Sequence, residues 1–317
     1  MQPGPIWRSS VQLGGVLRGP APSGVVTRTA RSPLHCALGE LTAREVVLVV
    51  ADWNPDLYLR FRQERTQPVK DLISRIDKEH AERIIDIGCG PGNSTIELKR
   101  RWPDAHIMGL DSSEAMLEAA RRDYPDLEWV HADASGDLSY LGKFDIVFSN
   151  AAIQWIPDHK RLLERLFNLV ADGGVMAMQV PNTGSMPIGL AVLQTAGEAR
   201  WQQHFSGVHT SLHYEDLSFY YDVLSPLAGE IHLWETHYNH VMSGHNAIIE
   251  WYKSTGMRPY LERLDETERA EFIQGVLSRV RVAYKAQQDG RVLFPFRRLF
   301  FVAYRRHAGD GQVCRRG

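Results

Sequence analysis

The stretch IIDIGCGPGNST, residues 84–95, decides the fold, because it places three glycines within five positions directly behind a run of apolar residues. This pattern is typical of a buried strand that turns tightly into a helix. Gly88, Gly90 and Gly92 allow a positive φ and carry no Cβ atom, so a ligand can lie against bare main chain. We therefore expect a strand, a ligand-binding turn, and a helix that begins near Asn93.

Strand-like apolar runs alternate with helical patterns through residues 83–180. This alternation predicts βαβ units on a parallel sheet, and almost wholly apolar strands are expected where helices cover both faces. The fold class is therefore expected to be α/β, with a doubly wound, mostly parallel sheet. The expected strands are RIIDIG, HIMGLD, LEWVHAD, FDIVFSN and GGVMAMQV, and the expected helices are STIELKRRW, SEAMLEAARR and HKRLLERLFNLV.

The alternation of strand-like and helical segments ends after Pro181. Residues 183–229 are expected to hold helix and loop, 230–241 a strand and 245–256 a helix. A longer helix is expected behind Asp265 as its N-cap, and RRLFFVAYRR is expected to close the sheet as a final strand. The helices should form a cap, contributed by about 183–229 and 243–290, on a domain that spans 50–307. The apolar face of the long helix is expected to contain Phe272, Val276, Val280 and Ala283.

Composition excludes several classes of protein. The 317 residues are 44% hydrophobic with a net charge of −2, which favours a small-molecule partner over nucleic acid or a membrane surface. Cys36, Cys89 and Cys314 are too few and too dispersed for a disulfide framework or a thiolate metal site, so a reducing, cytoplasmic location is expected. Two pairs of closely spaced histidines could in principle bind a metal, but no thiolates or carboxylate cluster accompany them as further ligands: His209/His213 and His237/His240. We expect no bound metal, no transmembrane helix and a monomer.

The two ends of the chain differ from the rest. Residues 1–49 are rich in Gly and Pro and carry four arginines before the first acid, so they are expected to be a disordered leader. An organellar transit peptide and a non-native or over-extended start are both open explanations. Residues 308–317 are expected to be a disordered tail.

Acidic residues stand at three strand ends. Asp111 follows the second strand, where a carboxylate accepts both hydroxyls of a ribose. Asp133 follows the third and is suited to an exocyclic adenine amine, and Asp86 could face an ammonium group. Taken singly, Asp111 as a helix cap and Asp133 as a turn residue remain open. Together, and with a G-x-G-x-G spacing that differs from the G-x-G-x-x-G of dinucleotide folds, they favour S-adenosylmethionine over NAD as the cofactor.

With these residues in place, the chain resembles the class I S-adenosylmethionine-dependent methyltransferases, and more narrowly the trans-aconitate 2-methyltransferase family. The resemblance covers roughly residues 51–306 and implies a seven-stranded Rossmann-like sheet. The family carries no leader like residues 1–49, and a start at Val49 or Val50 would give its usual beginning. The segments that carry the resemblance are ADWNPDLYLRF (51–61), DIGCGPGNST (86–95), GLDSSEAML (109–117), NAAIQWIPDH (150–159), AIIEWYKSTGMRPYL (247–261) and FPFRRLFFVAYRR (294–306).

The resemblance implies monomethyl esterification of trans-aconitate, a small tricarboxylate, with S-adenosylhomocysteine as the second product. The carboxylate nucleophile is already ionised at neutral pH, so no general base is expected, and Gln154 and Trp155 are candidates for positioning alone. The cofactor-binding residues expected are Asp86, Gly88, Gly90, Gly92, Asp111, Ser112, Asp133, Ala134 and Asn150.

Arginine forks and neutral donors are expected to hold the tricarboxylate. Arg258 in GMRP is the preferred candidate, while Arg298 and His245 have a structural or solvated role as the alternative. Tyr58, Tyr220 and Tyr221 are further candidates, and Trp53 with Tyr58 could form a lid. Two other hypotheses stay open: a different small or carrier-bound carboxylic acid as acceptor, and a cofactor-binding regulator without catalysis.

Overall fold

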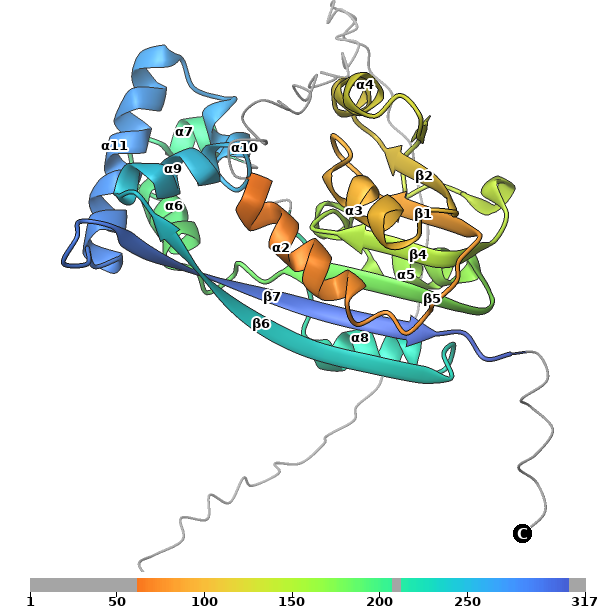
Figure 1. The fold of residues 1–317 in the computed structure, drawn as a ribbon. Helices are drawn as coiled ribbons and strands as arrows, with labels where there is room; N and C mark the ends of the chain where they lie inside the picture. The colour runs from red at the N-terminus through yellow and green to blue at the C-terminus, as the bar shows by residue number, and fades with distance from the viewer. Residues whose placement is uncertain (1–61, 207–211, 308–317) are drawn as a thin grey trace, which may run out of the picture. The chain divides into compact units, whose positions relative to one another are not determined.

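The computed structural model describes residues 62–206 and 212–307, which Figure 1 draws in colour. The leader expected at 1–49, the tail expected at 308–317, and the residues Trp53, Tyr58 and His209 lie outside the described residues. Among the residues that are described, no helix is both long and apolar enough to cross a bilayer.

One seven-stranded sheet organises the described chain, in the order β3-β2-β1-β4-β5-β7-β6. The first five strands pair in parallel, and β7 runs antiparallel to both β5 and β6. The predicted α/β class and mostly parallel sheet are confirmed. The last strand does not close the sheet, however, because β7 inserts between β5 and β6 and leaves β6 at the edge. The strands are β1 Arg83–Ile87, β2 His106–Asp111, β3 Glu128–His131, β4 Phe144–Asn150, β5 Val170–Pro181, β6 Glu230–Met242 and β7 Val292–Tyr304.

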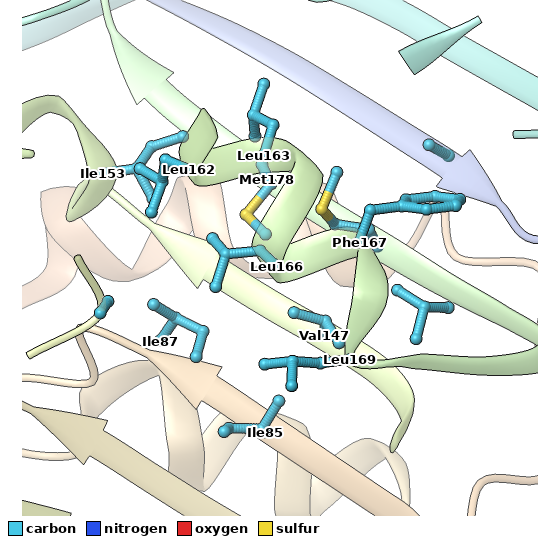
Figure 2. Close-up of a cluster of buried hydrophobic side chains, with 14 of the residues drawn as sticks. Ile85, Ile87, Val147, Ile153, Leu162, Leu163, Leu166, Phe167, Leu169 and Met178 are labelled. Carbon is cyan, nitrogen blue, oxygen red and sulfur yellow. The ribbon is translucent and has the colours of Figure 1, made fainter. Parts of the chain in front are cut away.

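Helices cover both faces of this sheet, which explains why the central strands β1, β2, β4 and β5 are largely apolar and buried. On one face α2 (Arg62–Ile73) and α3 (Asn93–Arg101) pack over Ile84, Ile146 and Phe300. On the other face α5 (His159–Asn168) and α8 (Leu217–Leu224) pack over Ile85, Val147, Met178 and Phe301. Figure 2 shows Leu162, Leu163, Leu166 and Phe167 of α5 in one cluster with Val147 and Met178.

A third hydrophobic cluster forms around the far halves of β6 and β7, where both strands run beyond β5 (Figure 1). Its helices are α6 (Pro187–Ala196), α7 (Gln202–Phe205), α9 (His245–Lys253), α10 (Arg258–Leu261) and α11 (Glu266–Ala283). We call these five helices the cap. The helix α8 lies within 183–229 but packs on the sheet instead.

The long helix of the cap begins as its sequence predicts. Asp265 accepts a hydrogen bond from the Glu268 N–H at 2.8 Å, and the Glu268 side chain accepts one from the Asp265 N–H at 3.1 Å, which completes a capping box. Three residues of the predicted apolar face are buried, namely Phe272, Val276 and Val280. Ala283 is exposed, and Tyr284 takes the buried place because it lies four residues, about one turn, beyond Val280.

Two glycines give Trp129 its place between β2 and the glycine turn. A Cβ atom at Gly109 would lie 2.4 Å from the Trp129 ring, and one at Gly92 would lie 2.8 Å from that ring and 2.9 Å from Tyr124. Trp129 also donates its indole N–H to the Tyr124 carbonyl at 3.0 Å. The indole therefore needs both positions to lack a side chain.

Gly109→Ala should lower the free energy of unfolding by about 1–3 kcal/mol, the usual cost of overpacking, because the added methyl group overlaps the indole. The double variant Gly109→Ala/Trp129→Leu should lose less unfolding free energy than the sum of the two single variants, since leucine is smaller than tryptophan and leaves room for the added methyl group. Urea unfolding of the four proteins measures this coupling. Strictly additive losses would mean that Gly109 does not make room for Trp129.

Candidate active site

The main cavity lies at the carboxyl ends of β1, β2 and β4 and has a volume of about 330 Å³. The sheet order reverses here, because β1 has β2 on one side and β4 on the other. Open α/β sheets bind ligands at such switch points. The Ser149 hydroxyl fixes the two strands against each other by donating to the Ile87 carbonyl at 2.8 Å.

The glycine turn forms one wall of this cavity. Gly88 and Gly90 have φ of 69° and 55°, in the left-handed region that favours glycine. A Cβ atom at Gly88 would lie 2.2 Å from that of Ala152, whereas one at Gly90 would meet nothing within 4 Å. Gly88 therefore permits close approach of the β4 loop, and Gly90 presents bare main chain to the cavity.

Asp111 is held by main-chain donors from two directions. One carboxylate oxygen accepts from the Gly90 N–H at 2.8 Å, and the other accepts from the Ser113 N–H at 2.9 Å. These two bonds fix the position of the carboxylate at the edge of the cavity. The N-cap residue of the next helix, α4 (Glu114–Asp123), is Ser113 rather than Asp111, since the Ser113 hydroxyl accepts a hydrogen bond from the Met116 N–H.

Asp133 and Ala134 line the cavity next to Ser112 and Leu110. Asp133 lies two residues beyond the end of β3, in a turn where its carboxylate accepts from the Ser135 N–H at 2.7 Å. The turn explanation and the ligand explanation are thus compatible for this residue. Leu110 and Ala134 are buried and offer an apolar contact for a planar ring.

Asp86 does not line the cavity. It is completely buried, and one of its oxygens accepts from the Ser94 and Thr95 hydroxyls at 2.6 and 2.7 Å. Its other oxygen, Oδ1, has no hydrogen-bond partner in the structure. Burial raises the pKa of Asp86 from 3.8 to about 6, against the opposing effect of the two hydroxyl bonds.

Gly92 is the other predicted cofactor residue that stays away from the cavity. Gly92 is the N-cap residue of α3 and has a φ of 87°. Because it has no side chain, it leaves room for the rings of Trp129 and Tyr124. Gly92 thus has a packing role in the structure, and its contact with the cofactor stays a prediction.

The loop after β4 closes the cavity between its two ends. Ala151 takes a φ of 53°, which is uncommon for a residue with a Cβ atom and indicates a strained turn. Asn150 and Gln154 are buried cavity-lining residues, and each carries a side-chain oxygen that has no partner in the structure. Gln154 donates from its amide nitrogen to the Ala151 carbonyl at 2.6 Å, and Trp155 lines the cavity beside it.

Two arginines line the opposite end of the cavity. Arg298 of β7 is 3% exposed, donates to the Gln179 side-chain oxygen at 3.0 Å, and lies over the Phe296 ring at 4.6 Å. Arg65 of α2 donates to the Ser254 hydroxyl at 3.1 Å and lies over the Trp251 ring at 5.0 Å. Carboxylates at one end and guanidinium groups at the other give this cavity two chemically different halves.

Arg258, the arginine that the sequence favoured, lies outside this cavity. It forms an ion pair with Glu262 at 2.8 Å, one turn along the chain. The order of preference between Arg258 and Arg298 is therefore reversed. Arg65 and Trp251 were not anticipated, because their place at the cavity depends on how α2 and the cap meet the sheet and leaves no local signal in the sequence.

Three further predicted substrate residues also lie away from the cavity. Tyr220 is fully buried beneath the sheet, where its hydroxyl meets His159 Nδ1 at 2.9 Å and its ring stacks on Phe301. Tyr221 is 50% exposed on the outer side of α8. His245 meets the Tyr284 carbonyl at 2.7 Å. Tyr220 and His245 therefore have structural contacts instead.

Comparison with known proteins finds relatives among the trans-aconitate 2-methyltransferases. The methyltransferase-domain family matches residues 84–174. The trans-aconitate 2-methyltransferase of Azoarcus sp. (strain BH72) is 40% identical over 253 residues, which cover 80% of this chain and 99% of that protein. The trans-aconitate 2-methyltransferase of Escherichia coli (strain K12 / DH10B) is 40% identical over 260 residues, covering 81% and 99%. Among solved structures, the YcgJ protein from Bacillus subtilis covers 76% of this chain and 99% of its own at 13% identity and a TM-score of 0.48.

Asp86→Asn should change how the stability of the ligand-free protein depends on pH. An unfolded aspartate ionises near pH 4, whereas Asp86 in the folded protein ionises near pH 6. Between these values the folded state binds more protons, so wild-type stability falls as pH rises. Relative to Asp86→Asn, the unfolding free energy of the wild type should drop by up to about 3 kcal/mol between pH 4 and pH 7. Chemical unfolding across this range tests it, and parallel pH profiles would contradict it.

Proposed function

This chain belongs to the trans-aconitate 2-methyltransferase family, and on that premise we propose that its acceptor is trans-aconitate, which it converts to a monomethyl ester. The chain is an S-adenosylmethionine-dependent methyltransferase. The observation that carries the acceptor proposal is the division of one cavity into an acidic end, Asp111 and Asp133, and a basic end, Arg65 and Arg298. A cofactor with hydroxyls and amines fits the first, and a polycarboxylate fits the second.

The residues present fit the cofactor. Gly90 offers main chain where a side chain would fill the cavity, and Asp111 offers a carboxylate whose position two N–H groups fix. We assign the ribose hydroxyls to Asp111 and the adenine amine to Asp133, with Leu110 and Ala134 against the ring. The unpartnered oxygen of Asn150 lines the cavity and is an acceptor for the amino group of the cofactor.

When bound, S-adenosylmethionine supplies an electrophilic methyl group, and its sulfur keeps the electron pair of the broken bond as S-adenosylhomocysteine. The acceptor carboxylate is ionised at neutral pH, so the protein has no proton to remove. Its residues instead align the acceptor oxygen and exclude water. Gln154 and Trp155 lie on the loop between the two ends of the cavity, which is the place for that alignment.

Arg298 is the residue that we assign to an acceptor carboxylate. Its guanidinium is buried between Phe296 and Gln179, in surroundings where a charge-assisted hydrogen bond is stronger than in water. The planar fork of arginine matches the two oxygens of a carboxylate. Arg65 lies at the same end, stacked on Trp251, and is suited to a second carboxylate.

Labelled S-adenosylmethionine and trans-aconitate should give a base-labile methyl ester that depends on the enzyme. Trans-aconitate should have the highest kcat/KM in a panel of unsubstituted di- and tricarboxylates, because the cavity has two arginines for its carboxylates. The decisive comparison includes cis-aconitate, citrate and succinate at matched ionic strength. A higher kcat/KM for one of these acids would remove trans-aconitate as the proposed acceptor.

Arg298→Gln should raise KM for trans-aconitate by about 10- to 100-fold, the worth of a charge-assisted hydrogen bond, while the dissociation constant for S-adenosylhomocysteine stays within about twofold. Arg297→Gln is the matched control, because the neighbouring Arg297 pairs with Glu235 and is 44% exposed. Steady-state kinetics and calorimetry separate the two effects. Equal KM values for the two variants would exclude Arg298 from the acceptor site.

A further inference from the structure

A second, smaller cavity of about 140 Å³ adjoins the main cavity, and we call it the annex. Trp155, Thr183 and Tyr252 line both cavities, so the annex lies beside the loop and the cap residues that surround the acceptor end. Its other walls come partly from the cap, through Val192 and Leu193 of α6 and Tyr260 of α10, and partly from segments outside the five cap helices, which contribute Gly184, Leu212, Tyr214 and Gly256. The annex is therefore placed to receive a part of the acceptor rather than of the cofactor.

Among the residues that the structure describes, none of those that line the annex carries a charged side chain. The walls are formed by aliphatic and aromatic groups, with three tyrosines and one threonine as the polar contributors. A carboxylate placed here would lose its hydration without gaining a partner of opposite charge, which is costly. The three carboxylates of a tricarboxylate therefore belong to the main cavity, and the annex suits an apolar group.

Glycines shape this space. A Cβ atom at Gly184 would lie 2.2 Å from the Tyr214 hydroxyl, and one at Gly256 would lie 2.4 Å from the Tyr252 ring. Both glycines line the annex, as do both tyrosines. The aromatic rings that form its walls can occupy their positions because these two residues lack side chains. Two matched pairs of this kind indicate a shaped cavity rather than a chance gap between helices.

We propose that the annex binds an apolar substituent on the acceptor acid, so that the acceptors of this enzyme include dicarboxylic acids with an alkyl or alkenyl arm. The carboxylates of such an acid occupy the basic end of the main cavity, and the arm passes beside Trp155 and Tyr252 into the annex. The methyl transfer itself is unchanged. This assignment rests on the proposed function, because it takes the basic end as the acceptor site.

The test measures binding, so that it does not depend on turnover. Full-length protein saturated with S-adenosylhomocysteine is titrated with methyl-, ethyl-, butyl- and hexylsuccinate. Each methylene that enters the annex should tighten binding by about three- to fourfold, until the annex is full and the gain stops. A butyl arm that ends in a hydroxyl should lose most of this gain. No dependence on chain length, or equal binding of the hydroxyl-ended arm, would overturn the proposal.

A pair of variants on one helix locates the effect. Leu193 lines the annex and Leu190 does not, although both belong to α6 and are 48% and 45% exposed. Leu193→Trp should fill the annex and abolish the dependence on chain length, whereas Leu190→Trp should preserve it. Neither variant should alter the affinity for S-adenosylhomocysteine. An unchanged chain-length dependence in Leu193→Trp would overturn the proposal.

The kinetics with trans-aconitate separate this proposal from the proposed function. If trans-aconitate is methylated and alkyl arms bring no affinity, the annex assignment fails and the acceptor assignment stands. If alkyl arms bind in the predicted series and trans-aconitate is not methylated, the annex assignment stands and the acceptor assignment fails.

Discussion

The hydrogen bond from the Gly90 N–H to the Asp111 carboxylate is the contact on which the rest of the site depends. It joins the turn after β1 to the end of β2, two segments that βαβ geometry brings together at the same edge of the sheet. The bond is made from the left-handed backbone that glycine permits at position 90, and it fixes the carboxylate at the edge of the cavity. Gly88 and Ala152 bring the β4 loop against this pair, so the wall of the cavity follows from one turn and one acid.

The basic end of the cavity exists because β6 and β7 extend beyond β5. Their near halves complete the methyltransferase sheet, and their far halves support the cap, as Figure 1 shows. Arg298 lies where these halves meet, opposite Pro181 of β5 and Thr236 of β6. A single antiparallel strand thereby places a buried cation across the cavity from the acids of the parallel strands. The opposite charges of the proposed cofactor and acceptor sites are a consequence of this topology, because Asp111 and Arg298 are almost 200 residues apart in the chain and line the same cavity.

Local patterns in the sequence predicted much of the fold. The five parallel strands, the turn at 88–92 and the capping box at Asp265 are each encoded within a few residues of one another. The tertiary arrangement of these elements was harder to predict from the sequence. The position of β7 between β5 and β6 depends on pairing between strands that are distant in the sequence. The helix α2 is polar and contains Pro68, so its sequence shows no helical periodicity of apolar residues. For the same reason Arg258, which lies in a family segment, looked more suitable than Arg298, and Tyr220 gave no sign that its hydroxyl would meet His159 beneath the sheet.

The central claim is that one cavity holds a nucleoside on Asp111 and a polycarboxylate on Arg298, with the loop after β4 between them. The most direct measurement is a crystal structure of the protein with S-adenosylhomocysteine and trans-aconitate. Both ribose hydroxyls are predicted to donate to Asp111, and a carboxylate of the acid is predicted to accept from Arg298. An acid held by Arg258 outside the cavity, or an adenosine that does not contact Asp111, would contradict this account.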